Sequence, residues 1–218
     1  MSLVLAIETS SPTYIVAVGD GESPDAQRSA RRHDPGFAGL GEMTAQLLAT
    51  AGLGFSDIGT VAVDVGPGGL SSIRLAVAYA NGLAFSLGVK VFPVSSLELM
   101  AIAAQLEHPG PVLSLKRAQG GNVYAGLFDG DETVELRHGL PDSIVPAMAA
   151  GLATLRVAGG AGYDLAALLP GTAIVDSGIE DADVTVLYQA ARAALKDPDR
   201  LVDLADALNE GSLIFHKQ

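Results

Sequence analysis

The strands and helices expected from the sequence follow one series, and this series occurs roughly twice. In the first half, apolar runs and helical spacings predict strands 3–7, 14–18 and 26–32, helix 40–51, strand 60–65, helix 71–87, strand 89–94 and a helix from residue 95. The second half predicts strands 111–115, 123–128 and 133–137, helix 142–150, strands 155–158 and 173–175 and helix 184–195. This repeated order favours an α/β fold of two subdomains, each a mixed sheet flanked by helices.

The boundary between the two halves is expected near residues 107–111. Residues 1–106 would form an N-terminal subdomain, and residues 107–218 a C-terminal one. Asp197-Pro198 is typical of a helix start, and it predicts a last helix with Leu201, Leu204, Ala205 and Leu208 on one face. We expect the last helices to pack back on the first subdomain.

Composition excludes several classes of protein. The chain has no cysteine, which excludes a disulfide-stapled scaffold, and its mean hydropathy of +0.35 excludes a disordered chain. The longest stretch without a charged residue runs only from Leu75 to Val89, which is shorter than the roughly 18 residues of a membrane span. No basic segment precedes the first apolar run, so no signal peptide is expected. These features predict a soluble protein of the cytoplasm.

The charge of the chain is strongly negative, with 25 acidic against 13 basic residues and a net charge of −12. Residues 176–210 are the most acidic stretch, which predicts a solvated face or a docking surface for a basic partner. Only Arg28, Arg31 and Arg32 form a basic cluster. The chain is therefore poorly suited to hold nucleic acid by itself.

Three segments carry residues suited to a phosphate or nucleotide. Glu8, Thr9 and Ser10 follow the first strand, Gly66 and Gly68 precede the helix from residue 71, and Gly159 and Gly160 follow the strand at 155–158. A carboxylate with hydroxyls can hold a metal and phosphate, and glycines let backbone N–H groups approach an anion. The alternative is that all three are tight turns. The histidines are isolated in the sequence, and we expect no metal site.

The helix from residue 71 to 87 is apolar on every side. Small residues such as Ala80 and Ala84 alternate with large ones, so neighbouring elements can approach closely. A helix without a polar face must be covered on both sides. Either this chain covers both sides, or one side is a protein interface.

Two stretches resemble the TsaB (YeaZ) family of tRNA threonylcarbamoyladenosine biosynthesis. They are Leu5-Ala6-Ile7-Glu8-Thr9-Ser10 with its continuation to Val18, and Gly66-Pro67-Gly68-Gly69 through Arg74 to Val94-Ser95-Ser96-Leu97-Glu98. The resemblance covers roughly residues 3 to 105. It implies a duplicated actin-like ATPase (ribonuclease H-like) fold.

The resemblance also implies partners. In that family, helices of the N-terminal half pack against a second copy or against the homologous catalytic protein TsaD. It therefore implies a heterodimer with a TsaD-like homologue, a TsaE-like ATPase as a further partner and a homodimer when the chain is alone. Contact with tRNA would be indirect, and none with a membrane is expected. The residues implied at the interface are Ile73, Arg74, Val77, Ala80, Asn81 and Ala84.

Departures from the family pattern argue against catalysis by this chain. The first acid is Glu8 where the family usually has Asp, Arg117 stands where an acid is common, and residues 213–216 only faintly match the usual ending. We therefore expect a divergent, non-catalytic subunit that supports TsaD in threonylcarbamoyl transfer to tRNA adenosine. It would bind ATP or ADP with Mg weakly, if at all, at the complex interface. The alternatives are a small actin-like ATPase or kinase with a degenerate nucleotide site and a glycoprotease-type metallopeptidase.

Overall fold

The structure is a computed structural model that describes residues 3–130, 132–160 and 162–208. The described chain divides into two compact units. Among the described residues, the first unit comprises residues 3–95 together with residues 183–207, and the second comprises residues 96–182 together with Leu208. The expected division at residues 106 and 107 differs from this one in two places. Residues 183–207 belong to the first unit, and α3 (Ser96–Glu107) belongs to the second. That helix packs on β6, β7 and β9 of the second unit.

The sheet of the first unit has five strands in the order β3-β2-β1-β4-β5. Their bounds are β1 (Leu3–Glu8), β2 (Thr13–Gly19), β3 (Ala26–Arg31), β4 (Ile58–Asp64) and β5 (Lys90–Val94). β1, β2 and β3 form an antiparallel meander, whereas β4 and β5 run parallel to β1. β1 is buried along its whole length because helices cover both faces of the sheet.

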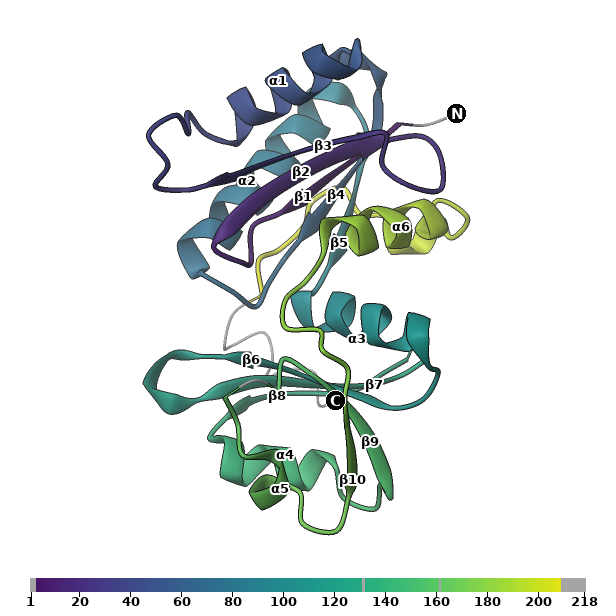
Figure 1. The fold of residues 1–218 in the computed structure, drawn as a ribbon. Helices are drawn as coiled ribbons and strands as arrows, with labels where there is room; N and C mark the ends of the chain where they lie inside the picture. Colours follow the sequence, from purple (N-terminus) through teal and green to yellow (C-terminus); the bar gives the residue numbers. More distant parts are fainter. Residues whose placement is uncertain (1–2, 131, 161, 209–218) are drawn as a thin grey trace. The chain divides into compact units, whose positions relative to one another are not determined.

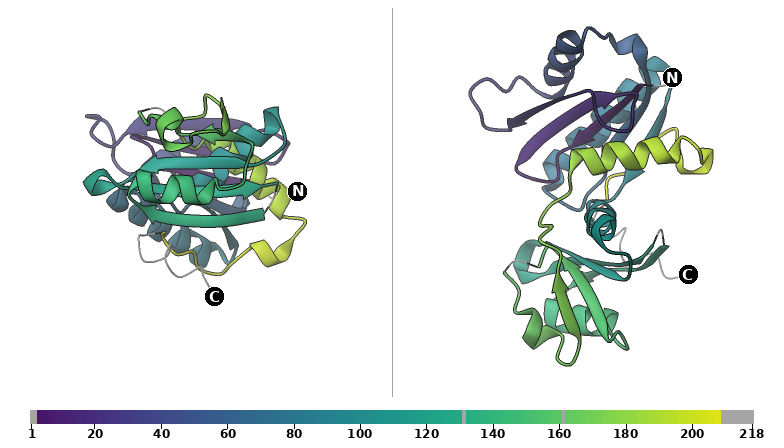
Figure 2. Two further views of the ribbon diagram at one scale, coloured as in Figure 1. Left: turned by 90° about the horizontal axis from the view of Figure 1, so that it is seen from below. Right: turned by 45° about the vertical axis from the view of Figure 1, so that its right-hand side comes forward.

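Three helices flank this sheet (Figures 1 and 2). α1 (Leu40–Ala51) and α2 (Leu70–Leu87) lie on one face, and α6 (Val184–Ala194) lies on the other. α6 comes from the far end of the sequence and packs on β1, β2, β4 and β5. α2 ends at Gly88, whose positive φ of 68° allows the left-handed turn that closes the helix.

The second unit has the same construction. Its strand order is β10-β9-β6-β7-β8, with β6 (Val112–Arg117), β7 (Val123–Asp129), β8 (Glu132–Gly139), β9 (Thr154–Ala158) and β10 (Ala173–Asp176). β6, β7 and β8 are antiparallel, and β9 and β10 continue the sheet in parallel with β6. Taken in chain order, the two sheets are the same, which confirms the duplicated fold expected from the sequence.

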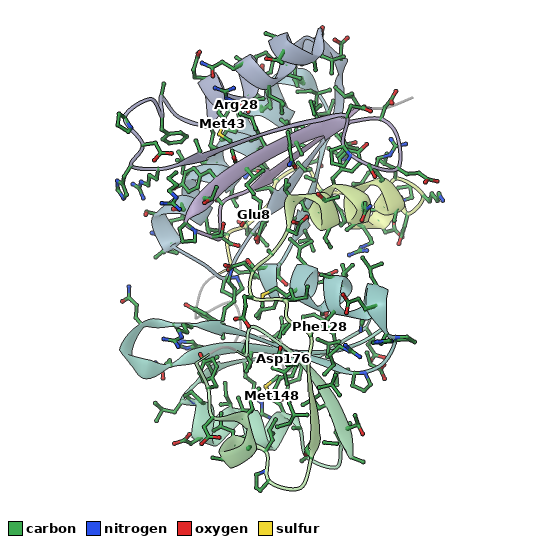
Figure 3. All side chains as sticks on the ribbon, viewed as in Figure 1. Glu8, Arg28, Met43, Phe128, Met148 and Asp176 are labelled. Carbon is green, nitrogen blue, oxygen red and sulfur yellow. The ribbon has the colours of Figure 1, made fainter. Side chains whose placement is uncertain are left out.

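The second sheet separates two apolar clusters. α4 (Pro141–Met148) and the short α5 (Leu165–Leu168) cover one face with a cluster that includes Val145 and Met148. α3 covers the other face with a cluster that includes Met100 and Phe128. Figure 3 shows Phe128 and Met148 on opposite sides of the sheet.

The prediction of a last helix from Asp197 onward is wrong. Only Pro198–Arg200 turns, as one short 3-10 helix, and the chain then runs extended. The backbone of Val202 exchanges two hydrogen bonds of 2.9 Å with Val91 at the open edge of β5. Pairing with this edge satisfies backbone groups that a short isolated helix would leave to water.

α2 is the one helix within the described residues whose length and composition would allow it to cross a membrane. Its inner side packs against β4 and β5 and buries Ile73, Ala76, Val77, Ala80 and Ala84. The helix is therefore an integral part of the first unit.

Candidate functional site

The Glu8 carboxylate lies at the end of β1 and is completely buried. Its Oε1 accepts hydrogen bonds from the backbone N–H of Ser10 at 2.5 Å, the Ser10 hydroxyl at 2.6 Å and the backbone N–H of Ser11 at 3.2 Å. Its Oε2 accepts one from the Ser11 hydroxyl at 3.2 Å. The longer side chain of Glu lets the carboxylate fold back over the turn that follows it. Glu8 therefore organises the β1–β2 turn (Figure 3).

A second buried carboxylate, Asp64, ends the neighbouring strand β4. Its Oδ1 accepts a hydrogen bond of 2.8 Å from the backbone N–H of Gly66. β1 and β4 are parallel, so both acids stand at the same edge of the sheet. Asp64 is not among the residues predicted from the sequence, although it follows an apolar strand and precedes Gly66-Pro67-Gly68-Gly69.

The two predicted first-unit segments meet at Gly68. A Cβ atom on Gly68 would stand 2.8 Å from the carbonyl oxygen and 2.9 Å from the Cα of Ser10, so only glycine allows this approach. The Thr9 hydroxyl donates to the carbonyl of Ser72 at 3.2 Å, and the Tyr14 hydroxyl donates to Oγ of Ser72 at 2.5 Å. These contacts join the β1–β2 turn to the start of α2.

The corresponding segment of the second unit is arranged differently. β6 ends at Arg117 where β1 ends at Glu8, and β9 ends at Ala158 where β4 ends at Asp64. The Arg117 guanidinium occupies the space where a side chain at Gly162 would lie, and it stands 5.8 Å from the centre of the Tyr163 ring. Gly159 packs directly on the backbone of Leu115, and its backbone N–H donates to Ile179. The ends of β6 and β9, which correspond to the ends of β1 and β4, therefore carry a cation and no carboxylate.

The six residues predicted at an interface divide into two groups. Ile73, Val77, Ala80 and Ala84 are buried against the chain's own sheet. Arg74 is exposed, and Asn81 is partly buried, with its amide bonded to the backbone of Ala205. The four buried side chains are therefore core residues of the first unit.

The exposed side of α2 is a different stripe of the same helix. We call it the outer stripe, and it consists of Ser71, Arg74, Leu75, Ala78, Gly82, Phe85 and Ser86. Its members recur at helical spacing, and Phe85 is 85% exposed and Leu75 44% exposed. Because it places exposed apolar side chains side by side on an otherwise well-packed helix, the outer stripe is the candidate interaction surface of this unit. The sequence pattern could not identify the outer stripe as the exposed side, because both sides of the helix are apolar.

α1 supports this helix from the side. A Cβ atom on Gly41 would lie 3.8 Å from the Tyr79 ring, so the two helices approach closely there. Burial raises the pKa of the Tyr79 phenol, and the neighbouring Thr44 hydroxyl partly offsets the shift. α2 thus packs against both α1 and the sheet, with its outer stripe directed away from the sheet.

Two units of this topology, with helices on both faces of each sheet, define the duplicated actin-like ATPase (ribonuclease H-like) class. The family model described as TsaD, tRNA N6-adenosine threonylcarbamoyltransferase, matches residues 6–154. The chain belongs to this family.

Solved structures also relate the chain to YeaZ, the TsaB protein. The crystal structure of an uncharacterized protein with similarity to peptidase YeaZ from Pseudomonas aeruginosa has a TM-score of 0.77 at 25% identity, over 96% of this chain and 99% of that one. YeaZ from Pseudomonas aeruginosa has a TM-score of 0.70 at 25% identity, over 91% and 94% of the two chains. These similarities confirm the resemblance to TsaB that the sequence motifs indicate.

Curated relatives match over shorter stretches. The chain is 32% identical to the tRNA threonylcarbamoyladenosine biosynthesis protein TsaB of Haemophilus influenzae over 124 residues, which are 56% of this chain and 51% of that protein. It is 42% identical to the tRNA N6-adenosine threonylcarbamoyltransferase of Moorella thermoacetica over 90 residues, 40% of this chain and 26% of that enzyme. The chain thus spans between a quarter and a half of the length of these two relatives.

Proposed function

We propose that this chain is a non-catalytic, TsaB-like subunit that supports a TsaD-like homologue in threonylcarbamoyl transfer to tRNA adenosine. It acts in the cytoplasm, reaches tRNA only through its partner, and meets a TsaE-like ATPase in the same assembly. Alone, it forms a homodimer. The observation that carries this proposal is the exposed outer stripe of α2 in a chain of the TsaD family.

The side chains at the strand ends favour an accessory role for this chain over a catalytic one. The Glu8 carboxylate is buried and already accepts four hydrogen bonds from Ser10 and Ser11, so it does not fit a nucleotide-bound magnesium ion in this arrangement. In the second unit, Arg117 and Ala158 stand at the corresponding positions. No observation favours the ATPase or the metallopeptidase.

The outer stripe has the character of a helix-packing surface. Ala78 and Gly82 are small and would let a partner helix approach closely, and Phe85 offers a large anchor at one end. A Cβ atom on Gly82 meets nothing within 4 Å, so the space above it is open. Two helices of this kind can bury the exposed apolar side chains that a monomer leaves in water.

The test is co-purification of the tagged chain with the TsaD-like homologue from the same organism. Ala78→Arg and Gly82→Arg place a long cation on the outer stripe, where the free chain has room for it. Ala193→Arg, at an exposed position of α6 on the opposite face of the same sheet, is the matched control.

We expect the wild type and Ala193→Arg to co-elute with the homologue and the two stripe variants to elute alone. Circular dichroism and the melting temperature should be unchanged in all three variants. Co-elution of both stripe variants at wild-type level would exclude the outer stripe as the interface. Failure of the wild type to bind would contradict the proposed function itself.

A further inference from the structure

The first unit carries exposed arginines, two of which lie on or beside the outer stripe. Between residues 3 and 95 the chain has four arginines, Arg28, Arg31, Arg32 and Arg74, and all are exposed. Within the described residues none of them forms an ion pair, whereas Lys90 pairs with Asp203 at 2.6 Å. These guanidinium groups are therefore available to carboxylates of another molecule, in a chain whose own net charge is −12.

Two of these arginines are brought together at the start of α2. Nη1 of Arg32 donates a hydrogen bond of 2.7 Å to Oγ of Ser71, which fixes the guanidinium against the first turn of the helix. Arg74 follows Ser71 by three residues and therefore projects from the same side of α2. The amino-terminal end of the helix macrodipole adds positive potential at the same place.

The outer stripe consequently has two different ends. Arg74 and Phe85 are eleven positions apart, which corresponds to about 16 Å along an α-helix. One end is basic, the middle is formed by Ala78 and Gly82, and the other end is apolar and aromatic. A partner that covers the whole stripe must suit both ends.

Few acidic groups of this chain lie near the basic end. α2 itself contains no acid, and the only acid of α1, Glu42, accepts a hydrogen bond of 2.7 Å from Gln46. Asp34, in the loop after β3, accepts from the backbone N–H of Arg31. Arg28 lies on the α1 side of β3, near Met43 (Figure 3).

We propose that Arg32 and Arg74 select the partner of the outer stripe by binding carboxylates on its surface. The proposal rests on the proposed function and names the chemistry of that partner: a protein with an apolar helix face and acidic side chains near one end. A second copy of this chain has no acid on α2 to offer, so the two arginines favour a heterologous partner over self-association. Opposite charges at the rim of an interface contribute mainly to specificity and to the rate of association.

The test measures the dissociation constant for the TsaD-like homologue by calorimetry at about 50 mM and about 500 mM salt. The variants are Arg32→Glu and Arg74→Glu. Lys196→Glu, an exposed lysine just beyond α6, makes the same change in net charge away from the stripe. Phe85→Ala, which removes the anchor without a change in charge, tests the surface itself.

We expect each arginine variant to weaken binding at least tenfold at low salt, with a difference that shrinks at high salt. Lys196→Glu should bind like the wild type, and sedimentation should show the homodimer unaffected by Arg74→Glu. Equal affinity of Arg74→Glu and Lys196→Glu would overturn the inference while leaving the proposed function intact if Phe85→Ala still weakens binding. Loss of tRNA binding by Arg74→Glu without loss of partner affinity would also overturn it, because the arginines would then bind phosphate.

Discussion

Asn81 of α2 and Ala205 near the end of the described chain exchange two hydrogen bonds. Nδ2 of Asn81 donates to the carbonyl of Ala205 at 2.9 Å, and Oδ1 accepts from the Ala205 N–H at 2.9 Å. The side-chain amide of Asn81 thus pairs with the backbone of Ala205 in the way that a neighbouring strand would. It ties residues 198–207, which we call the C-terminal strap, to the helix that carries the outer stripe.

Replacing Asn81 with Asp should release this part of the strap. The shape is kept, but the NH₂ donor becomes a carboxylate oxygen that faces the Ala205 carbonyl, so one bond is lost and a repulsion is added. We expect a loss of about 1–3 kcal/mol and faster hydrogen exchange at Val202 and Ala205. Lys90→Ala, which removes only the exposed ion pair with Asp203, should cost less than about 1 kcal/mol. Equal effects of the two variants would contradict this role of Asn81.

The fold of the second unit requires glycine at position 126. A Cβ atom there would stand 2.5 Å from Cε2 and 2.9 Å from Cζ of Phe128, and 3.0 Å from Cδ2 of Leu136. Both neighbours belong to the apolar cluster under α3 or pack against it, and they cannot move without opening it. We expect Gly126→Ala to lower the free energy of unfolding by about 1–3 kcal/mol in chemical denaturation. Gly36→Ala, at a glycine with nothing within 4 Å, is the control and should change it little.

Much of the fold could be predicted because its signals are local. The apolar run from Leu3 to Ile7 and the glycines at Gly52 and Gly88 indicate strands and helix ends through chemistry that acts within a few residues. The last helix failed because Leu201 and Leu204 satisfy helical spacing, while the edge of β5, far away in sequence, offers Val202 a better backbone partner. The spacing of apolar residues within one segment contains no information about backbone partners that a distant segment offers.

The candidate surfaces show the same limit. The sequence identified α2 as a helix that must be covered on both sides, but it contains no signal for which side faces the sheet. Ile73 and Leu75 are equally apolar, yet one is 1% exposed and the other 44%. The partners of Glu8 were foreseeable because Ser10 and Ser11 are its neighbours, whereas the contact of Gly68 with Ser10 depends on the pairing of β1 with β4.

Ionisation of Tyr163 should lower the stability of the protein at alkaline pH. In the part of the chain that the structure describes, its buried hydroxyl oxygen has no hydrogen-bond partner. Burial raises the pKa of this phenol, and nearby Arg117 partly offsets the shift. Below pH of about 10 the phenol is neutral in both the folded and the unfolded chain, so no stability depends on it there. Above that pH the unfolded chain ionises first, and stability falls as pH rises towards the folded pKa.

We therefore expect Tyr163→Phe to flatten the decline in unfolding free energy above pH of about 10, measured by urea titration at several pH values. At neutral pH this variant should be neutral or slightly stabilising, because no hydrogen bond is lost. Tyr14→Phe provides the contrast, since its hydroxyl donates to Ser72, and it should cost about 1 kcal/mol at neutral pH. A steeper alkaline decline in Tyr163→Phe would show that the assignment to this phenol is wrong.

Glu8→Gln separates a structural role of the first carboxylate from a nucleotide-binding one. The carboxylate accepts four hydrogen bonds from Ser10 and Ser11, and an amide offers one acceptor oxygen and places an NH₂ group against the remaining donors. We expect the variant to lose about 1–3 kcal/mol of stability. Calorimetry with Mg-ATP should give affinity in the millimolar range or weaker for the isolated wild type and the same for the variant. If the wild type instead binds Mg-ATP tightly and Glu8→Gln abolishes this binding with stability unchanged, the carboxylate belongs to a nucleotide site. That result would support the ATPase alternative.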